Sequence, residues 1–142
     1  MNFITPMVAI GELGDALDLH SLEEQGIRAV LSLAPVNLVG AIEHHLQLEI
    51  ADRVPLPFDI ITTALEFINR HVHSGQRVLL HCEMGISRSP SLAVCYLHET
   101  EGLTIDAAIE HVKSARPIAE PHPELIESIR SYFNQKPQSN QI

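Results

Sequence analysis

The amino-acid sequence predicts an α/β protein with a mostly parallel central sheet of about four or five strands, flanked by helices. Three observations support this fold class. Short apolar runs alternate with helical patterns in the first half of the chain. The most apolar of these runs, 27–33 and 77–81, have the length of buried strands. With 142 residues, of which 45% are hydrophobic, the chain is long enough for one domain with its own core.

Strands are predicted where short apolar or alternating runs lie near glycine or proline residues. The first run ends at Gly11, and the second is closed by Pro35. The segment 36–45 is predicted to be a loop with room for a helical turn. The predicted strands are residues 7–10, 27–33, 46–50 and 77–81.

Helices are predicted where apolar residues recur at helical spacing. The clearest of them has Ile61, Ala64 and Ile68 on one face. Gly26 and Gly102 are expected to end two of the others, because glycine is common just after a helix. The predicted helices are residues 15–25, 60–74, 90–101, 104–116 and 121–133.

The composition argues against several classes of partner. The formal net charge is −9, and aromatic residues make up only 4% of the chain, with no Trp. Such a chain lacks the basic face and the stacking surfaces of a nucleic-acid binder, and it is unsuited to an anionic membrane. We therefore expect no nucleic acid and no membrane as a partner, and we expect a monomer.

The cysteine count and the N-terminal sequence indicate a compartment. Two cysteines are too few for a disulfide framework, and a cysteine beside a histidine in a polar loop is typical of a catalytic thiol. The first residues lack the basic region and long apolar run of a signal peptide, and no stretch has the length of a membrane span. We therefore expect a cytoplasmic protein in a reducing environment.

The stretch from His81 to Ser89, which reads HCEMGISRS, carries the chemistry. Cys82 directly follows a predicted strand, and Arg88 directly precedes a predicted helix. The loop amides can form a nest, the N-terminus of the helix is positive, and the Arg88 guanidinium is a planar fork suited to two phosphate oxygens. The same features would stabilise a thiolate at Cys82, so one loop could both bind a phosphate dianion and supply a nucleophile.

Other residues of this stretch have predicted supporting roles. The Ser89 hydroxyl could hydrogen-bond the sulfur and ease its release, and His81 could brace the loop through its ring nitrogens. Gly85 would allow a backbone conformation that bulkier residues disfavour. The alternative interpretation is a buried structural cysteine before a helix, with an incidental arginine. The predicted phosphate-binding residues are Glu83, Met84, Gly85, Ile86, Ser87 and Arg88.

This stretch resembles the HCxxGxxRS signature of the cysteine-dependent protein tyrosine phosphatase superfamily. The length and the surrounding pattern resemble the dual-specificity branch over residues 4–133. The resemblance implies a protein tyrosine phosphatase-like fold, with a catalytic domain at residues 1–134. The remaining segment, 135–142, is polar and contains Pro137, so it is predicted to be a flexible C-terminal tail. The resemblance also implies a phosphocysteine mechanism that uses no metal and no other cofactor.

The resemblance further implies that the substrate is a phosphorylated protein or peptide, carrying phosphotyrosine and also phosphoserine or phosphothreonine. It implies a general acid on a loop roughly thirty residues before the cysteine. Asp52 lies at that distance, after a predicted strand and in a loop with two prolines. Asp59 is the competing candidate, but it lies at the start of a predicted helix. The expected catalytic residues are Cys82, Arg88, Asp52 and Ser89, with His81 in support.

Two other functions stay open on the sequence alone. The protein could recognise phosphate without turnover, as a binding module, or it could hydrolyse a small-molecule phosphate. Lipid substrates are disfavoured because the loop residues Glu83, Met84 and Ile86 are not basic.

Further residues receive other interpretations. Cys95 is predicted to be a core cysteine, with a redox partnership with the loop cysteine as the alternative. The histidines at 44–45 and 71–73 are interpreted as surface residues, because no cysteine or carboxylate cluster completes a metal site. Arg53 and Arg116 are candidates to assist substrate binding, and Arg116 is equally a candidate for a structural role.

Overall fold

The central sheet has five strands in the order β1-β2-β5-β3-β4 in the computed structural model, which describes residues 1–135. The strands are β1 Asn2–Phe3, β2 Val8–Gly11, β3 Ile27–Ser32, β4 His44–Gln47 and β5 Arg77–His81. β1 is antiparallel to β2, and the other neighbouring pairs are parallel. The predicted α/β class and mostly parallel sheet are confirmed. β1 is absent from the prediction because two residues carry no periodic pattern.

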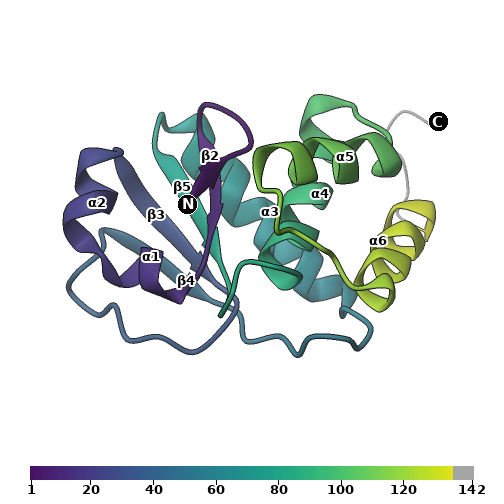
Figure 1. The fold of residues 1–142 in the computed structure, drawn as a ribbon, viewed down its shortest axis with the longest axis horizontal. Helices are drawn as coiled ribbons and strands as arrows, with labels where there is room; N and C mark the ends of the chain where they lie inside the picture. Colours follow the sequence, from purple (N-terminus) through teal and green to yellow (C-terminus); the bar gives the residue numbers. More distant parts are fainter. Residues whose placement is uncertain (136–142) are drawn as a thin grey trace.

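Helices cover both faces of the sheet (Figure 1). α1 (Leu13–Leu17) and α2 (Leu19–Glu24) lie on one face. The longer helices lie on the opposite face, and α3 and α4 both contact the central strand β5. Their bounds are α3 Phe58–His73, α4 Arg88–Glu101, α5 Ile105–Ala115 and α6 Pro123–Gln135. The sheet is therefore the middle of three layers.

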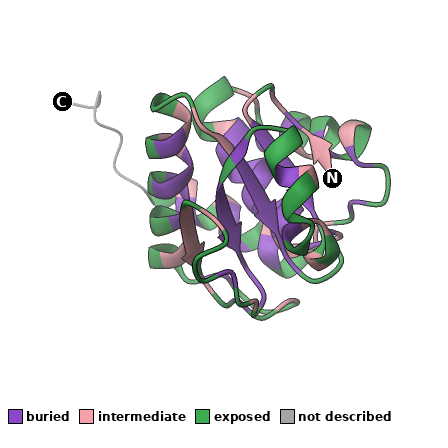
Figure 2. Ribbon diagram, turned by 90° about the vertical axis from the view of Figure 1, so that its left-hand side faces the viewer, coloured by how far each residue is buried: buried purple, intermediate pink, exposed green. Residues whose placement is uncertain are grey.

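The alternation of side chains along β5 separates two hydrophobic cores. Val78 and Leu80 belong to the larger core on the side of α3–α6, whereas Leu79 belongs to the smaller core on the side of α1 and α2. All three side chains are fully buried, and Figure 2 shows the central strands as the buried middle of the molecule. β5 is apolar along its whole interior because both of its faces are covered.

The register brings the carboxyl ends of three parallel strands to one level. His81 at the end of β5 pairs with Gly11 at the end of β2 and with Ser32 at the end of β3. Cys82 follows at the edge where these strands end, which is where α/β sheets place their ligands.

The segment predicted as one helix over 15–25 forms two short helices instead. Asp18 interrupts it, because the Asp18 side chain accepts a hydrogen bond from the Ser21 N–H at 3.1 Å and so caps the start of α2. A helix-capping residue inside an otherwise helical pattern therefore divided the predicted helix into two.

The fourth strand also differs from its prediction. β4 begins at His44 and ends at Gln47, whereas the apolar alternation predicted residues 46–50. The last strand pair is Ser32 with Gln47. Beyond it the Leu48 N–H donates to the Ser32 carbonyl at 2.8 Å and the Ile50 N–H to the Leu33 carbonyl at 3.3 Å, but residues 48–50 are not strand.

The predicted flexible tail at 135–142 lies outside the described residues, except for Gln135, which ends α6. Among residues 1–135, the helices fall short of the length and apolar character that a membrane-spanning helix needs.

Candidate active site

The signature loop, residues 82–88, connects the end of β5 to the first residue of α4. Cys82 lies at its floor with 2% of its surface exposed. The Gly85 N–H donates to Cys82 Sγ at 3.2 Å, and Ser89 Oγ lies 3.3 Å from the same sulfur. The Gly85 N–H can only donate, whereas the Ser89 hydroxyl lies within hydrogen-bond distance of both the sulfur and the Gly11 carbonyl, to which it donates at 3.5 Å. A backbone donor aimed at the sulfur stabilises negative charge there, so the arrangement suits a thiolate.

Five successive carbonyl groups of the signature loop point outward, because each accepts a hydrogen bond from outside the loop. In a trans peptide the next N–H points away from the carbonyl, and no peptide in the described chain is cis. The amides of residues 84–88 therefore point inward and form an anion-binding nest. The outer donors are Leu13 N for Glu83, Arg116 for Met84 and Gly85, Glu120 N for Ile86, and Ser91 N for Ser87.

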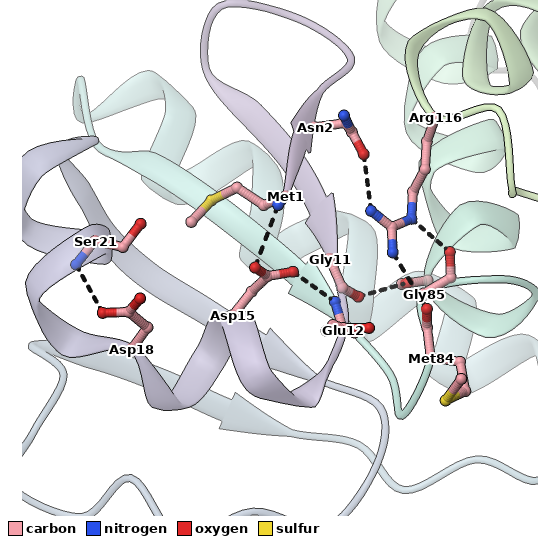
Figure 3. Close-up of polar contacts among 11 residues, drawn as sticks. Met1, Asn2, Gly11, Glu12, Asp15, Asp18, Ser21, Met84, Gly85 and Arg116 are labelled. Atoms are coloured by element: carbon pink, nitrogen blue, oxygen red, sulfur yellow. Dashed lines mark hydrogen bonds and ion pairs between the residues drawn. The ribbon is translucent and has the colours of Figure 1, made fainter.

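Arg116, at the C-terminal end of α5, supports the signature loop from behind (Figure 3). Its buried guanidinium donates from Nε to the Gly85 carbonyl at 2.7 Å and from Nη2 to the Met84 carbonyl at 3.2 Å. Its Nη1 donates to Asn2 Oδ1 at 2.8 Å, so β1 holds the other side of the guanidinium. Of the two roles considered for Arg116, these contacts favour the structural one, because the side chain lies on the carbonyl side of the loop.

Gly85 is required at the tightest point of the loop. Its φ of +68° lies in the left-handed region, which side chains disfavour. A Cβ at this position would lie 2.5 Å from Arg116 Nη2 and 2.8 Å from the carbonyl oxygen of Gly11. Backbone conformation and packing therefore both demand glycine here.

Arg88 begins α4, and 17% of its side chain is exposed. Its Nη1 donates to the Ile50 carbonyl at 3.2 Å, and its Nη2 lies 4.0 Å from Glu83 Oε2. The hydrogen bond to Ile50 fixes the guanidinium beside the nest. Because a guanidinium carries five N–H donors, most of them are left for an oxyanion.

Asp52 lies in the turn between β4 and α3 and is half-buried. Its Oδ1 accepts hydrogen bonds from Ser87 Oγ at 2.8 Å and from the Arg53 N–H at 2.9 Å. Asp59 is exposed in the first turn of α3. Of the two candidate acids, Asp52 is therefore the one that contacts the signature loop.

His81 anchors the loop through a chain of hydrogen bonds. Its Nδ1 lies 3.0 Å from the Cys82 carbonyl, its Nε2 lies 2.6 Å from Ser32 Oγ, and Ser32 Oγ lies 2.8 Å from His45 Nε2. Because a carbonyl only accepts, we assign the His81 proton to Nδ1, so Ser32 donates to His81 and accepts from His45. Burial lowers the pKa of His81 and the pKa of His45, which keeps both rings neutral as this chain requires.

Two polar residues that contact the site through these bonds, Asn2 and Ser32, were not singled out by the sequence, and His45 was interpreted as a surface residue although its half-buried ring bonds Ser32. All three lie far from the signature stretch in the chain, so no local spacing connects them. The one available signal is Ser32, a polar residue that follows the apolar run Ala29–Leu31 at the end of β3.

Cys95 and His71, to which the sequence assigned no catalytic role, are both buried. Cys95 is fully buried in α4, where burial raises the pKa of its thiol. The surface interpretation is wrong for His71, which is buried, with its ring 4.5 Å from the Phe67 ring and its Nδ1 2.6 Å from Gln76 Oε1. Within residues 1–135, no three His, Cys, Asp or Glu side chains are arranged to hold a metal ion.

Comparison with known families gives a match over nearly the whole described chain. The family model of the dual specificity phosphatase catalytic domain matches residues 9–135.

Two curated relatives illustrate the match. Phosphatidylglycerophosphate phosphatase PTPMT2 of Arabidopsis thaliana is 34% identical over 115 residues, which cover 75% of this chain and 50% of that protein. Dual specificity protein phosphatase 2 of Mus musculus is 30% identical over 122 residues, which cover 84% of this chain and 38% of that protein. The chain therefore spans about half, or less, of these relatives.

Solved structures share the fold along almost their full length. The structure of DUSP15 is 26% identical with a TM-score of 0.84 and covers 98% of both chains. The human tyrosine phosphatase-like serine/threonine/tyrosine-interacting protein is 25% identical with a TM-score of 0.86, covering 94% of this chain and 95% of its own.

Proposed function

The chain belongs to the dual specificity phosphatase catalytic-domain family, as its signature stretch predicted, and we propose that it hydrolyses phosphate monoesters in proteins through a phosphocysteine intermediate. The observation that carries the proposal is the convergence of Cys82, the inward amides of residues 84–88, Arg88 and Asp52 in one loop region. These groups supply a nucleophile, an oxyanion site and a proton donor.

In the first step the Cys82 thiolate attacks phosphorus. The S–P bond forms while the bond from phosphorus to the leaving oxygen breaks. That oxygen takes a proton from the Asp52 carboxyl group, so an alcohol or phenol departs. Arg88 and the loop amides hold the three non-bridging oxygens and stabilise their charge in the transition state.

In the second step water attacks the phosphocysteine. Asp52, now a carboxylate, takes a proton from the water as its oxygen bonds to phosphorus. The S–P bond breaks, inorganic phosphate leaves, and sulfur returns as a thiolate. Ser89 Oγ, 3.3 Å from that sulfur, stabilises the departing negative charge through a hydrogen bond.

Every group in these two steps comes from the chain, the substrate or water, so the proposed reaction uses no metal and no other cofactor. We further infer that the substrate is a phosphorylated protein or peptide and that the protein acts in the cytoplasm as a monomer. The net charge of −9 supports the exclusion of nucleic acid and of anionic membranes as partners.

A lipid phosphate is the second candidate substrate, because the Arabidopsis relative is named a phosphatidylglycerophosphate phosphatase. The exposed side chain of Met84, in the signature loop, is compatible with an apolar neighbour. The loop positions of Glu83 and Ile86 offer no cation to a second anionic group of a lipid head. We therefore favour a protein substrate.

A phosphate-binding module without turnover is the alternative from another functional class. One of the solved structures with this fold is named a tyrosine phosphatase-like serine/threonine/tyrosine-interacting protein. In this chain Cys82, Arg88 and Asp52 are all present and brought to one loop, which favours turnover.

Hydrolysis of p-nitrophenyl phosphate separates these functions. Wild-type protein should hydrolyse it with and without a metal chelator, vanadate should inhibit, and Cys82→Ser should lose turnover while it still binds phosphate. Binding of a phosphopeptide by wild-type protein without any hydrolysis would support the binding module instead.

A substrate panel then distinguishes protein from lipid. We expect faster release of phosphate from phosphotyrosine and phosphothreonine peptides than from phosphatidylglycerophosphate in mixed micelles. The opposite ranking would assign the chain to lipid substrates.

A further inference from the structure

The side chain of Ser87 joins three loops beside the candidate acid. Its Oγ donates to Asp52 Oδ1 at 2.8 Å and accepts from the His122 N–H at 3.0 Å. Ser87 is 8% exposed, so water competes little for either bond. One hydroxyl therefore ties the signature loop both to the turn that carries Asp52 and to the segment before α6.

The direction of these bonds follows from what each group can do. The His122 N–H can only donate, so the Ser87 oxygen must be its acceptor. The single hydroxyl proton is then free to point at Asp52. The Arg53 N–H also donates to Asp52 Oδ1, at 2.9 Å. Oδ1 thus receives two hydrogen bonds, whereas Oδ2 makes none with the residues that the structure describes.

A carboxyl oxygen that already accepts two hydrogen bonds is a poor place for a proton, because the proton would point at another donor. Protonation of Asp52 is therefore directed to Oδ2. A proton on Oδ2 is the one that general-acid catalysis needs, since Oδ1 is occupied by the protein.

We propose that Ser87 is a positioning residue for general-acid catalysis, whose hydroxyl anchors Oδ1 of Asp52 so that Oδ2 holds and delivers the proton. This inference rests on the proposed function. In the step concerned, the bond from phosphorus to the leaving oxygen breaks as the S–P bond forms, and the Oδ2 proton moves to the leaving oxygen. Ser87 exchanges no proton in the reaction and acts through Asp52.

The test uses two substrates that differ in their need for an acid. A nitrophenyl phosphate has a stable leaving anion and depends little on protonation, whereas phenyl phosphate depends strongly on it. Ser87→Ala should lower kcat/KM for phenyl phosphate by roughly tenfold to a hundredfold, which is part of the roughly 10²- to 10⁴-fold that a general acid contributes. The value for the nitrophenyl ester should change by less than about threefold.

A double-mutant cycle with Asp52→Asn shows whether Ser87 acts through Asp52. In the Asp52→Asn background, Ser87→Ala should have no further effect on phenyl phosphate. Ser91→Ala is the matched control: it removes another buried hydroxyl one turn along α4, which bonds the Ser87 carbonyl and not Asp52. It should keep the wild-type ratio between the two substrates.

Ser87→Gly deletes the same hydroxyl and carries the test if the alanine variant does not fold. Equal loss on both substrates, or an undiminished effect of the Ser87 substitution in the Asp52→Asn background, would overturn the proposal. A wild-type protein that hydrolyses neither ester would instead overturn the proposed function. A wild-type protein that is active, while Asp52→Asn shows no selective loss on phenyl phosphate, would remove Asp52 as the acid and the proposal with it.

Discussion

At the scale of single residues, the shape of the signature loop depends on the atoms that pack against its outer side. Gly85 shows this most directly, because its φ of +68° and the short approach to the Gly11 carbonyl act together. A side chain at position 85 would push against a backbone that belongs to a central strand and cannot yield locally. The nest is therefore held in shape by the sheet.

Gly85→Ala should destabilise the protein and remove its activity. We expect a loss of about 3 kcal/mol or more in the free energy of unfolding, from left-handed strain plus the clash. Gly40→Ala is the matched control, since its φ is +74° but nothing lies within 4 Å of the added Cβ. It should cost only about 1 kcal/mol. Denaturant unfolding of both variants measures the difference, and equal losses would contradict the packing argument.

The sequence indicated the residues whose chemistry is local to the signature stretch. Cys82 and Arg88 are separated by a short loop between a strand and a helix, so spacing alone placed them together. Asp52 followed from the family resemblance, which implies an acid on a loop at about that distance before the cysteine. Its tether to Ser87 did not, because a hydroxyl in a loop has many possible partners and only the folded chain selects one.

At the scale of elements, the end of α5 and the ends of the strands position the signature loop. Arg116 connects α5 to two loop carbonyls and to β1. The sequence did not predict this connection. It does not show whether the Arg116 guanidinium lies on the carbonyl side of the signature loop or in the anion-binding nest. The start of β4 was also missed, because its paired residues include His44 and His45, which an alternation of apolar residues does not mark.

Arg116→Lys should lower both stability and activity. Lysine cannot reproduce the fork, so at least one of the Met84 and Gly85 carbonyls loses its donor, at a cost of about 1–3 kcal/mol. kcat/KM for p-nitrophenyl phosphate should fall by roughly tenfold or more as the nest loosens. Arg130→Lys is the control, because its 2.6 Å pair with Asp106 is exposed and should matter by less than about 1 kcal/mol. Thermal unfolding that shifts alike in both variants would refute the support role.

The His81–Ser32–His45 chain predicts how stability depends on pH. Burial lowers the pKa of both rings below the usual value of about 6.5. In the unfolded state the rings take up protons as pH falls through that value, whereas in the folded state they resist. The unfolded state then binds more protons, so the free energy of unfolding decreases as pH falls below about 6.5.

The melting temperature should therefore drop between about pH 7 and pH 5.5. His45→Gln should make the melting temperature less dependent on pH, because it removes one of the two imidazole rings that resist protonation in the folded state. His20→Gln, on the exposed side of α2, is the control and should keep the wild-type slope. If the melting temperature of His45→Gln depended on pH as steeply as that of wild type, the role given to the His81–Ser32–His45 hydrogen bonds would be contradicted.

At the scale of the whole molecule, the sheet explains why the site lies where it does. Apolar runs that alternate with helical patterns predicted a mostly parallel sheet flanked by helices, and α1–α2 and α3–α6 cover its two faces. In such a sheet the strand ends meet at one edge, so the signature loop had to lie there once β5 was identified. The split of α1 from α2 depended on the Asp18 side chain, and the bounds of β4 depended on its backbone pairing with β3. Periodicity records neither.

The central claim is that the phosphoryl group of the substrate is transferred to the sulfur of Cys82 before water releases it as phosphate. Rapid acid quench during turnover of p-nitrophenyl phosphate, followed by mass spectrometry of the peptide that contains the signature loop, tests this most directly. We expect one phosphoryl group on Cys82 in the wild-type protein and none in Cys82→Ser, which should also lack turnover. Phosphate release by Cys82→Ser, or a phosphoryl group on any other residue during turnover, would contradict it.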